Sequence, residues 1–585
     1  MPPPHPPNPE NVNVPDTANK KIPIFETNLT EKPFQTRDAT DEEIPLYPHI
    51  TDKVPLSAWI VVLAGAAERA CYFGIIAPWQ NYLQIPRQYG AVPGALGLGQ
   101  STATNIYNAF FLFSFLTPMG FAIVSDVWLG RFKTLIVGLL VYLLGCLLLV
   151  FTSLPVALEH GSGLIGFIWA MILIGLGAGC VKATFFPLLG DQYVQKKAKL
   201  VMQKNGELAI IDATRTVQLI YNIYYWFTNF ASLVVIATTY LEKEYDFWAA
   251  YLLCTSCLCV AIIVLAFFSN KLVKISPTRQ NNLPMATKAI ICAAKNGFKL
   301  DNAKAAYQTS QKGKTVPWSD SFIEEMKRGL MACRVMQVKT PPFFEKSLSL
   351  LIFYLCINQI YNNLVSQAGQ MNLHNVPNDM IQVFSGVACV IFGPVIQGLY
   401  SLLAKRKIPF GPIARITAAF IVCAGAMAYA AGVQQLIYRS GPCYQYPLSC
   451  EASQGGKIPN DISVWVQLPV YFILAVAEIF GFVTASEYAY SKAPKDMKAV
   501  VQAIMQLTAC VASALGMALS LVSKDPKLVI MYASLAAAMG VSAALFFWKF
   551  SRYDDREDEM NKTNIQEDVK STDNCGVSVR DEERP

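Results

Sequence analysis

The chain has 585 residues, of which 53% are hydrophobic and only 15% are charged, and its mean hydropathy is +0.34. A soluble chain of this length usually divides into several domains and carries more charge, so the composition excludes an ordinary soluble protein. The net charge of +7 requires no nucleic-acid partner, because the distribution of basic residues along the loops accounts for it.

Residues 1–54 are polar and rich in proline, and they contain no apolar run near the start. A cleavable secretory signal is therefore not expected, and the first spanning helix itself must direct insertion. We predict that residues 1–54 form a disordered cytoplasmic tail.

About twelve apolar segments follow, each near the length of about 20 residues that a helix needs to span a bilayer. One such segment could be a buried core helix, but so many of them indicate a polytopic, all-α membrane protein. The predicted spans are 55–77, 100–124, 133–153, 163–186, 211–237, 247–269, 346–366, 380–403, 411–435, 463–489, 499–522 and 528–549.

Basic residues alternate between the two sets of connecting loops. One set carries "GRFK", "QKKAKLVMQK", "AKRK" and "SKAPKDMK", whereas the other carries "LEHGSG", "LEKEYD" and "NVPND". An excess of Lys and Arg marks the cytoplasmic side of a membrane. Both termini are therefore expected in the cytoplasm.

The segment 271–345 divides the spans into two six-helix bundles, 55–270 and 346–550. It belongs to the basic set of connections and contains two patterns typical of amphipathic helices, at 278–298 and 318–336. This plan resembles the major facilitator fold, in which substrate binds near the bilayer midplane between two halves. Residues 551–585 are polar and are expected to form a disordered cytoplasmic tail.

Four ionisable residues lie within the predicted spans, where charge is costly and usually functional. Glu68 and Arg69 lie in the first span, Lys182 in the fourth and Glu478 in the tenth. Two bases in one half and an acid in the other suit a zwitterionic solute, with Arg69 and Lys182 on its carboxylate and Glu478 on its ammonium group. The alternative is that these residues only fix helix packing, for example as a Glu68–Lys182 pair.

Glu68 is the candidate proton site, together with Arg69 and Lys182. Burial and a neighbouring cation act in opposite directions on the proton affinity of a carboxylate. Making or breaking such a contact can therefore tie protonation to the conformation of a carrier.

Uncharged polar residues extend this candidate site. Tyr72 lies one turn beyond Glu68 on the same helix face, and Tyr224 and Tyr225 lie in the fifth span. Gln359 belongs to a polar stripe in the seventh span. Hydrogen bonding or packing between helices is the alternative function of these residues.

Cysteine and histidine positions limit the other functions. Most of the 15 cysteines lie in apolar segments, but Cys443 and Cys450 flank a polar loop that we expect on the outside. These two residues could form a disulfide or remain free thiols, and the sequence leaves both alternatives open. All four histidines lie outside the spans, and no G-x-S-x-G or H-E-x-x-H motif occurs. An enzyme, a metal site and a cofactor are therefore not expected.

Several segments resemble motifs of the proton-dependent oligopeptide transporter family in its fungal form, over about residues 55–550. "GAAERACYFG" resembles E-x-x-E-R-F-x-Y-Y-G, and "GAGCVKATFFPLLGDQY" resembles a G-G-I-K-P run that ends in D-Q-F. "YYWFTNFASL" resembles F-Y-x-x-I-N-x-G-S-L. "NQIYNNLVSQAGQM", "VPNDMIQ" and "AEIFGFVTASEYAYSKAPKDMK" are the closest matches.

The resemblance implies proton-driven import of di- and tripeptides by a monomeric protein of the plasma membrane, with no cofactor. Arg69 and Lys182 would bind the peptide carboxylate, and Glu478 and Asn229 the amino terminus. The first-helix acid and Tyr72 would take part in coupling and binding. Protons, short peptides and the lipid bilayer are the expected partners.

The chain departs from the family pattern at several positions. Gly65 stands where the first Glu of the first-helix motif is expected, and Ala70, Phe73, Ala231 and Ser385 also differ. One titratable site is therefore lost, although the charges that would hold a zwitterion remain. The identity of the substrate stays open.

Two other functions remain open on the same scaffold. One is a transporter of another small molecule, such as an exporter of a secondary metabolite or toxin, with altered proton coupling. It would show no acid-stimulated dipeptide uptake. The other is a nutrient sensor, which would bind a peptide without transporting it.

Overall fold

The computed structural model describes most of the membrane part of the chain. The predicted C-terminal tail and most of the predicted N-terminal tail lie outside the described residues. These are 37–40, 43, 46–87, 91–195, 198–202, 207–276, 282–296, 300–332, 348–406, 408, 410–486 and 498–550.

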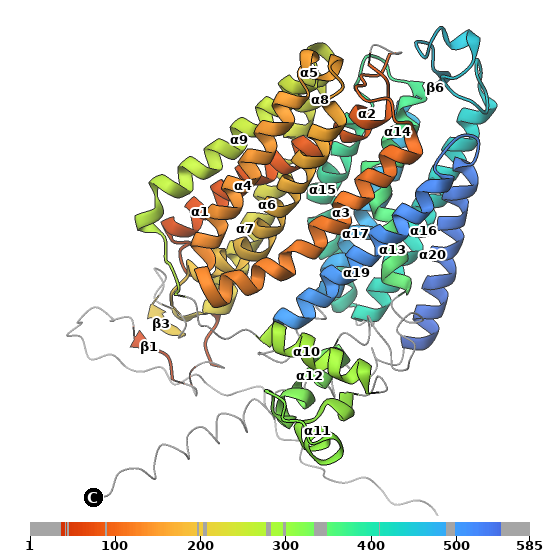
Figure 1. The fold of residues 1–585 in the computed structure, drawn as a ribbon. Coiled ribbons are helices and arrows are strands. Elements are labelled where there is room, and N and C mark those ends of the chain that lie inside the picture. The colour runs from red at the N-terminus through yellow and green to blue at the C-terminus, as the bar shows by residue number, and fades with distance from the viewer. Residues whose placement is uncertain are drawn as a thin grey trace, which may run out of the picture. The chain divides into compact units, whose positions relative to one another are not determined.

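Within these residues, 11 helices are long and apolar enough to cross a membrane, and six of them precede the linker. Several consist of two consecutive helical segments (Figure 1). The segments of this first half are α1 (Leu56–Ile76), α2 (Trp79–Gln84), α3 (Gln100–Ile123), η1 (Val124–Leu129), α4 (Arg131–Thr152), α5 (Pro155–Glu159), α6 (Gly163–Asp191), α7 (Ala213–Ala231), α8 (Val234–Glu244) and α9 (Phe247–Phe267), followed by η2 (Ser269–Lys271).

The second half contains the remaining spans, which cover the predicted segments to within a few residues. Their segments are η5 (Met380–Gln382), α15 (Val383–Lys405), α16 (Pro412–Arg439), η7 (Val464–Gln467), α17 (Leu468–Glu478), η8 (Ile479–Val483), α19 (Lys498–Leu519), η10 (Ser520–Val522) and α20 (Leu528–Phe550). Between α16 and η7 lie η6 (Glu451–Ser453) and β6 (Asn460–Ser463), which pairs with β5 (Met371–Asn372). Cys443 and Cys450 form a disulfide in this connection.

The segment predicted as the seventh span is interrupted, so it is not one of the 11 continuous helices. It consists of α13 (Leu348–Ile357), the 3₁₀ turn η4 (Asn358–Tyr361) and α14 (Asn363–Gly369). The side chain of Asn362 accepts a hydrogen bond from the backbone N–H of Asn363 and so caps a new helix at this point. A short polar side chain that competes for the backbone in this way ends a helix that the apolar pattern would continue.

Helices pack in pairs within each half, and α3 and α19 pack against each other between the halves. The α4–α6 pair depends on small residues. A Cβ atom at Gly177 would lie 2.4 Å from the Cβ of Tyr142, and one at Gly138 would lie 2.4 Å from the sulfur of Cys180. Glycine at these positions therefore allows the close helix approach that is common in membrane proteins.

The linker folds into α10 (Asn282–Lys295), η3 (Leu300–Ala303), α11 (Ala305–Lys312) and α12 (Asp320–Ala332). The first and last of these helices lie within the two segments predicted to be amphipathic. Their apolar faces form a small core that also contains Met119 and Ile123 of α3 and Ile504 of α19. We call this end of the helical unit the linker end and the opposite end, which carries α2 and α14, the α2 end (Figure 1).

A separate compact unit combines Met1–Asp52 with Gln195–Thr216. Its described part is a four-stranded sheet in the order β1-β3-β4-β2, with only β2 and β4 parallel. The strands are β1 (Arg37–Asp38), β2 (His49–Ile50), β3 (Lys199–Met202) and β4 (Leu208–Ile211). Two strands therefore lie in a segment for which the sequence predicts disorder, because their partners come from a distant part of the chain.

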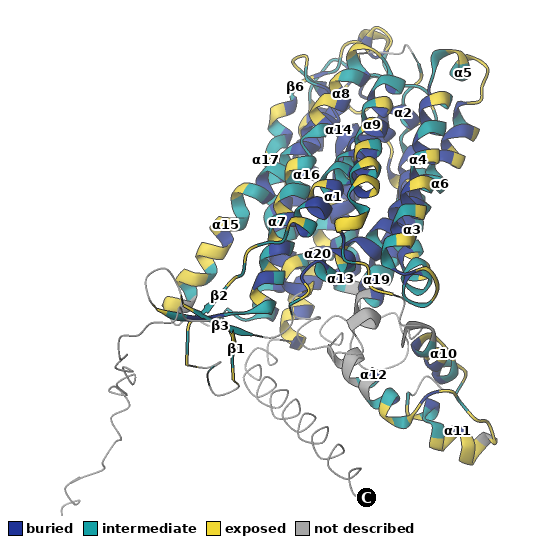
Figure 2. Cartoon of the chain, turned by 90° about the vertical axis from the view of Figure 1, so that its left-hand side faces the viewer, coloured by how far each residue is buried: buried dark blue, intermediate teal, exposed yellow. Residues whose placement is uncertain are grey.

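Large apolar side chains are exposed on the outer faces of the helices, as the yellow segments on α9 and α15 indicate (Figure 2). Trp128 is 70% exposed, Phe267 78% and Trp548 79%. In water, so many exposed apolar residues would favour aggregation, whereas lipid chains can cover them.

Candidate functional site

The first-half charges form one compact group on α1 and α6. Arg69 folds back onto its neighbour Glu68, with Nε 2.7 Å from Oε2 and Nη2 2.7 Å from Oε1. Glu68 is fully buried. A two-pronged arginine–carboxylate contact fixes the geometry of both groups, so in this conformation Glu68 neutralises Arg69.

Lys182 lies beside this pair without an ion pair of its own among the described residues. Its Nζ donates a hydrogen bond to the Oγ of Ser114 on α3 over 2.7 Å. It lies 4.7 Å from the ring centre of Phe115 and 5.2 Å from that of Tyr72, while the Arg69 guanidinium carbon lies 4.7 Å from the same Tyr72 ring. Aromatic faces stabilise nearby cations, so Tyr72 lies next to both bases.

The space beside Gly65 is filled by aromatic rings. A Cβ atom at Gly65 would lie 2.3 Å from Cζ of Phe185 and 2.6 Å from Cε2 of Tyr224, and these two rings stack at 5.4 Å. The structure thus accounts for glycine at a position where the resemblance leads us to expect glutamate. Tyr224 belongs to this packing.

Glu478 lies at the end of α17 in the second half and is half-buried. Among the described residues it forms no ion pair. Its electrostatic neighbours include Tyr354, Tyr361 and, from the first half, Tyr225. Tyr361 also interacts with Tyr72, so it connects the acid of one half with the bases of the other.

The remaining predicted residues, Asn229 and Gln359, form hydrogen bonds within their own half. Asn229 donates a hydrogen bond from Nδ2 to the backbone oxygen of Tyr225 over 2.9 Å. Gln359 is only 1% exposed, and its amide is engaged with the backbone of Leu355 and with Asn363. In this conformation Gln359 therefore supports the interrupted helix. The sequence analysis did not identify Ser114, Phe115 or Tyr361, because residues of these types are common in spans.

Hydrogen bonds between the halves gather at the α2 end, where α2 lies beside α14 (Figure 1). Each pairs a polar residue of the first half with one of the second. They join Gln80 to Ser366 (3.2 Å), Asn81 to Asn378 (2.9 Å in each direction), Gln100 and Thr104 to Asn363 (3.1 and 3.2 Å), Ser101 to the Ser520 carbonyl (2.5 Å) and Lys243 to the Asn375 carbonyl (2.6 Å). The α2 end is therefore closed.

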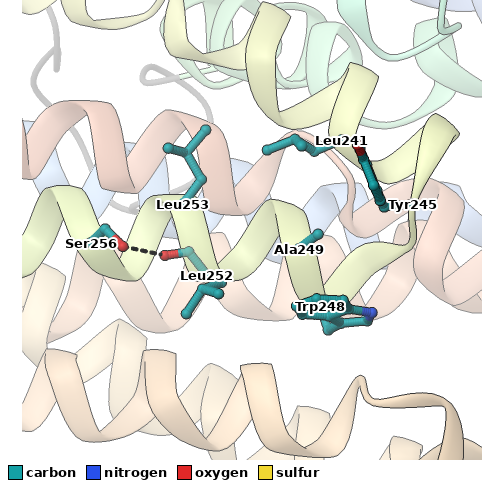
Figure 3. Close-up of a pocket in the computed structure, with 7 residues that line it drawn as sticks. All are labelled: Leu241, Tyr245, Trp248, Ala249, Leu252, Leu253 and Ser256. Carbon is teal, nitrogen blue, oxygen red and sulfur yellow. Dashed lines mark hydrogen bonds between the residues drawn. The ribbon is translucent and has the colours of Figure 1, made fainter.

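A shallow groove of about 370 Å³ lies on the outer surface of α8 and α9 (Figure 3). Ser256 of α9, which lines the groove, donates its hydroxyl to the Leu252 carbonyl over 2.9 Å. The groove contains none of the predicted site residues. It is lined by Leu241, Tyr245, Trp248, Ala249, Leu252, Leu253 and Ser256.

Two halves of membrane-spanning helices, closed at one end and carrying opposite charges, define the class of the protein as a membrane transporter of the major facilitator type. The profile of the POT family (PTR2) matches residues 132–536. The chain belongs to this family, as its motifs predict.

Known proteins that resemble the chain over most of its length support this assignment to the family. The peptide transporter PTR_A of Candidozyma auris is 36% identical over 559 residues, covering 96% of this chain and 92% of the relative. The probable peptide transporter ptr2 of Schizosaccharomyces pombe is 37% identical over 528 residues, covering 89% and 82%. The solved structure of the POT family transporter PepTSo has a TM-score of 0.64 at 16% identity, covering 86% of this chain and 99% of that one.

Proposed function

We propose that the protein is a proton-coupled symporter that imports di- and tripeptides by alternating access. The observation that carries this proposal is the division of charge, with Arg69 and Lys182 in one half and Glu478, which forms no ion pair among the described residues, in the other. Membership of a family whose curated relatives are named peptide transporters supports it.

The peptide carboxylate binds Arg69 and Lys182, and the ammonium group binds Glu478 with help from Asn229. Because Arg69 is engaged with Glu68, the peptide carboxylate can take its place only if Glu68 releases the guanidinium group. Protonation of Glu68 removes the charge that holds the pair together. Proton binding and peptide binding therefore favour each other.

The α2 end faces the outside of the cell and the linker end faces the cytoplasm of a monomer in the plasma membrane. Support comes from the basic residues of the linker and from the Cys443–Cys450 disulfide in a connection of the opposite end. Closure of the α2 end then corresponds to a conformation that is sealed against the outside.

Replacing Glu478 provides the sharpest test. In a host without peptide uptake, the intact protein should take up a radiolabelled dipeptide faster at pH 5 than at pH 7, with competition by tripeptides but not by free amino acids. Glu478→Gln should lose at least 90% of this uptake while it still reaches the membrane, because the ammonium group loses its counter-charge. Undiminished uptake by the variant removes Glu478 from the site.

The filled space beside Gly65 favours a second candidate, a transporter of another small molecule on the same scaffold. It would show no acid-stimulated dipeptide uptake, and cells that produce it would resist a toxic compound.

A further inference from the structure

Two buried carboxyl groups face each other across the boundary between the halves at the α2 end. Glu242 lies in the last turn of α8 in the first half, and Asp379 precedes η5 in the second. Glu242 is 3% exposed and Asp379 is fully buried, and the two carboxyl groups interact electrostatically. Asn81 donates hydrogen bonds both to Glu242 and to Asn378, the chain neighbour of Asp379. Two buried carboxylates repel each other when both are ionised, so a bound proton would stabilise the pair.

The hydrogen bonding around the pair is incomplete unless that proton is present. Asn81 donates to Oε1 of Glu242 over 3.2 Å. Oε2 of Glu242 and both oxygens of Asp379 have no donor of normal geometry among the described residues, although backbone amides near Asp379 favour its charged form. Buried polar atoms are almost always satisfied, and a proton shared between the two groups would satisfy at least two of the three oxygens.

The surroundings supply no cation to neutralise two negative charges. Asp246 adds a further negative charge near Glu242, and Arg87 forms its ion pair, at 3.2 Å, with Asp246. Lys243 donates to the backbone carbonyl of Asn375. Within the described part of the chain, no Lys, Arg or His forms an ion pair with Glu242 or Asp379.

The other helices packed around the pair present uncharged groups. The buried Tyr251 of α9 interacts electrostatically with both carboxyl groups, and the buried Tyr471 of α17 with Asp379. Two like charges in such a place would repel strongly, and separation of the halves would relieve the repulsion.

We propose that Glu242 and Asp379 form a proton-binding site that controls the α2 end, closed while the pair shares a proton and open when the proton is lost. Burial raises the pKa of Asp379 to about 6, which agrees with proton uptake on closure. The bound proton enters from the α2 side and returns to it, so it makes closure depend on pH without crossing the membrane. This last point rests on the proposed function, whereas the control of closure does not.

Linkage fixes the direction of the effect. In the open state both carboxyl groups contact water and titrate near their ordinary values, so between pH 5 and 7 they are ionised. Closure then takes up a proton, so the ratio of closed to open protein falls with rising pH, by up to about tenfold per unit below the pKa of the closed state. With a pKa of about 6 in the closed state, the expected change between pH 5 and pH 7 is about tenfold.

The test measures closure directly. Spin labels carried by unnatural amino acids at Val156 and Tyr446, exposed residues of opposite halves near the α2 end, report the distance between the halves in the full-length protein in lipid nanodiscs without peptide. The intact protein should shift from short to long distances between pH 5 and pH 8. Asp379→Asn and Glu242→Gln, whose amides donate a hydrogen bond at any pH, should show less than a twofold shift in population.

Asp525→Asn is the matched control. Asp525 also lies at this end, and burial raises its pKa to about 6, but its partners Tyr438 and Gln370 both belong to the second half. This variant should keep the pH response of the intact protein. The proposal is wrong if the intact protein shows no shift, if either variant of the pair keeps the full shift, or if Asp525→Asn abolishes it equally.

Two further measurements separate the possible outcomes. Replacing Na⁺ by choline at constant pH should leave the distances unchanged, and a change would assign the site to a metal cation and overturn the proposal. In uptake experiments, Asp379→Asn should change the pH profile of the rate but not the final accumulation of dipeptide. If no dipeptide is taken up at all, the proposed function fails while the distance measurement still decides the role of the pair.

Discussion

Arg69 and Lys182 differ in their partners although they lie beside the same ring. Arg69 is neutralised by Glu68, whereas the partners of Lys182 among the described residues are the Ser114 hydroxyl and the faces of Tyr72 and Phe115. Lys182 is therefore available to an incoming carboxylate in this conformation. Arg69 becomes available only after its contact with Glu68 is broken. Under the proposed function, Glu68 therefore couples proton binding to peptide binding.

Replacement of Glu68 should separate binding from coupling. Glu68→Gln keeps the shape of the side chain but cannot be ionised, so Arg69 is free at every pH. We expect loss of proton-driven accumulation, by tenfold or more, with counterflow exchange of labelled dipeptide retained. Loss of both activities would show instead that the Glu68–Arg69 pair is needed for the fold.

A glutamate introduced at position 65 should not restore a second coupling acid. Gly65→Glu places a Cβ atom against Phe185 and Tyr224, and such overpacking typically costs ~1–3 kcal/mol. The midpoint of thermal unfolding in detergent should fall. The double variant Gly65→Glu with Phe185→Ala should recover part of that loss, and a single variant as stable as the intact protein would contradict the packing argument.

At the scale of elements, the interrupted seventh segment of the second half forms hydrogen bonds to the first half. Asn362 caps α14, and the side-chain oxygen of Asn363 accepts hydrogen bonds from Gln100 and Thr104 of α3. The break in the helix thus coincides with residues that close the α2 end. An uninterrupted helix would give these side chains different directions.

Removal of the Asn363 side chain should weaken closure. Asn363→Ala loses two hydrogen bonds between the halves, each worth roughly 0.5–1.5 kcal/mol net, so the α2 end should open more often. The spin-label distance between positions 156 and 446 measures this shift. Gln434→Ala, which removes hydrogen bonds to Gln367 and Gln370 within the second half, should leave the distance unchanged.

Most of the helices could be predicted from the sequence, because an apolar run of membrane length has few other stable structures in lipid. The break at Asn362 could not, since it depends on one side-chain hydrogen bond. The strands at 37–38 and 49–50 pair with residues about 160 positions away, which no local pattern reveals. Charge within a span identified Glu68, Arg69, Lys182 and Glu478, whereas Glu242 and Asp379 lie at helix ends, where acids are ordinary.

At the scale of the whole molecule, the orientation of the protein in the membrane determines whether the α2 end or the linker end faces the outer solution. Acceptor sites for N-linked glycosylation can test the proposed orientation. An acceptor site introduced beside Tyr446 should be glycosylated, and one beside Gly313 in the linker should not. The enzyme that attaches N-linked glycans acts only on segments that reach the outer side of the membrane. Uptake of each variant confirms that it is folded, and glycosylation at Gly313 would reverse the orientation.

The small core of the linker has a consequence for the energy of transport. It joins Met119 and Ile123 of the first half to Ile504 of the second, so its contacts change whenever the halves rock against each other. Each Å² of apolar surface that this core exposes or buries contributes about 25 cal/mol to the difference between the two states. The sequence of the linker can therefore adjust the balance between the two states.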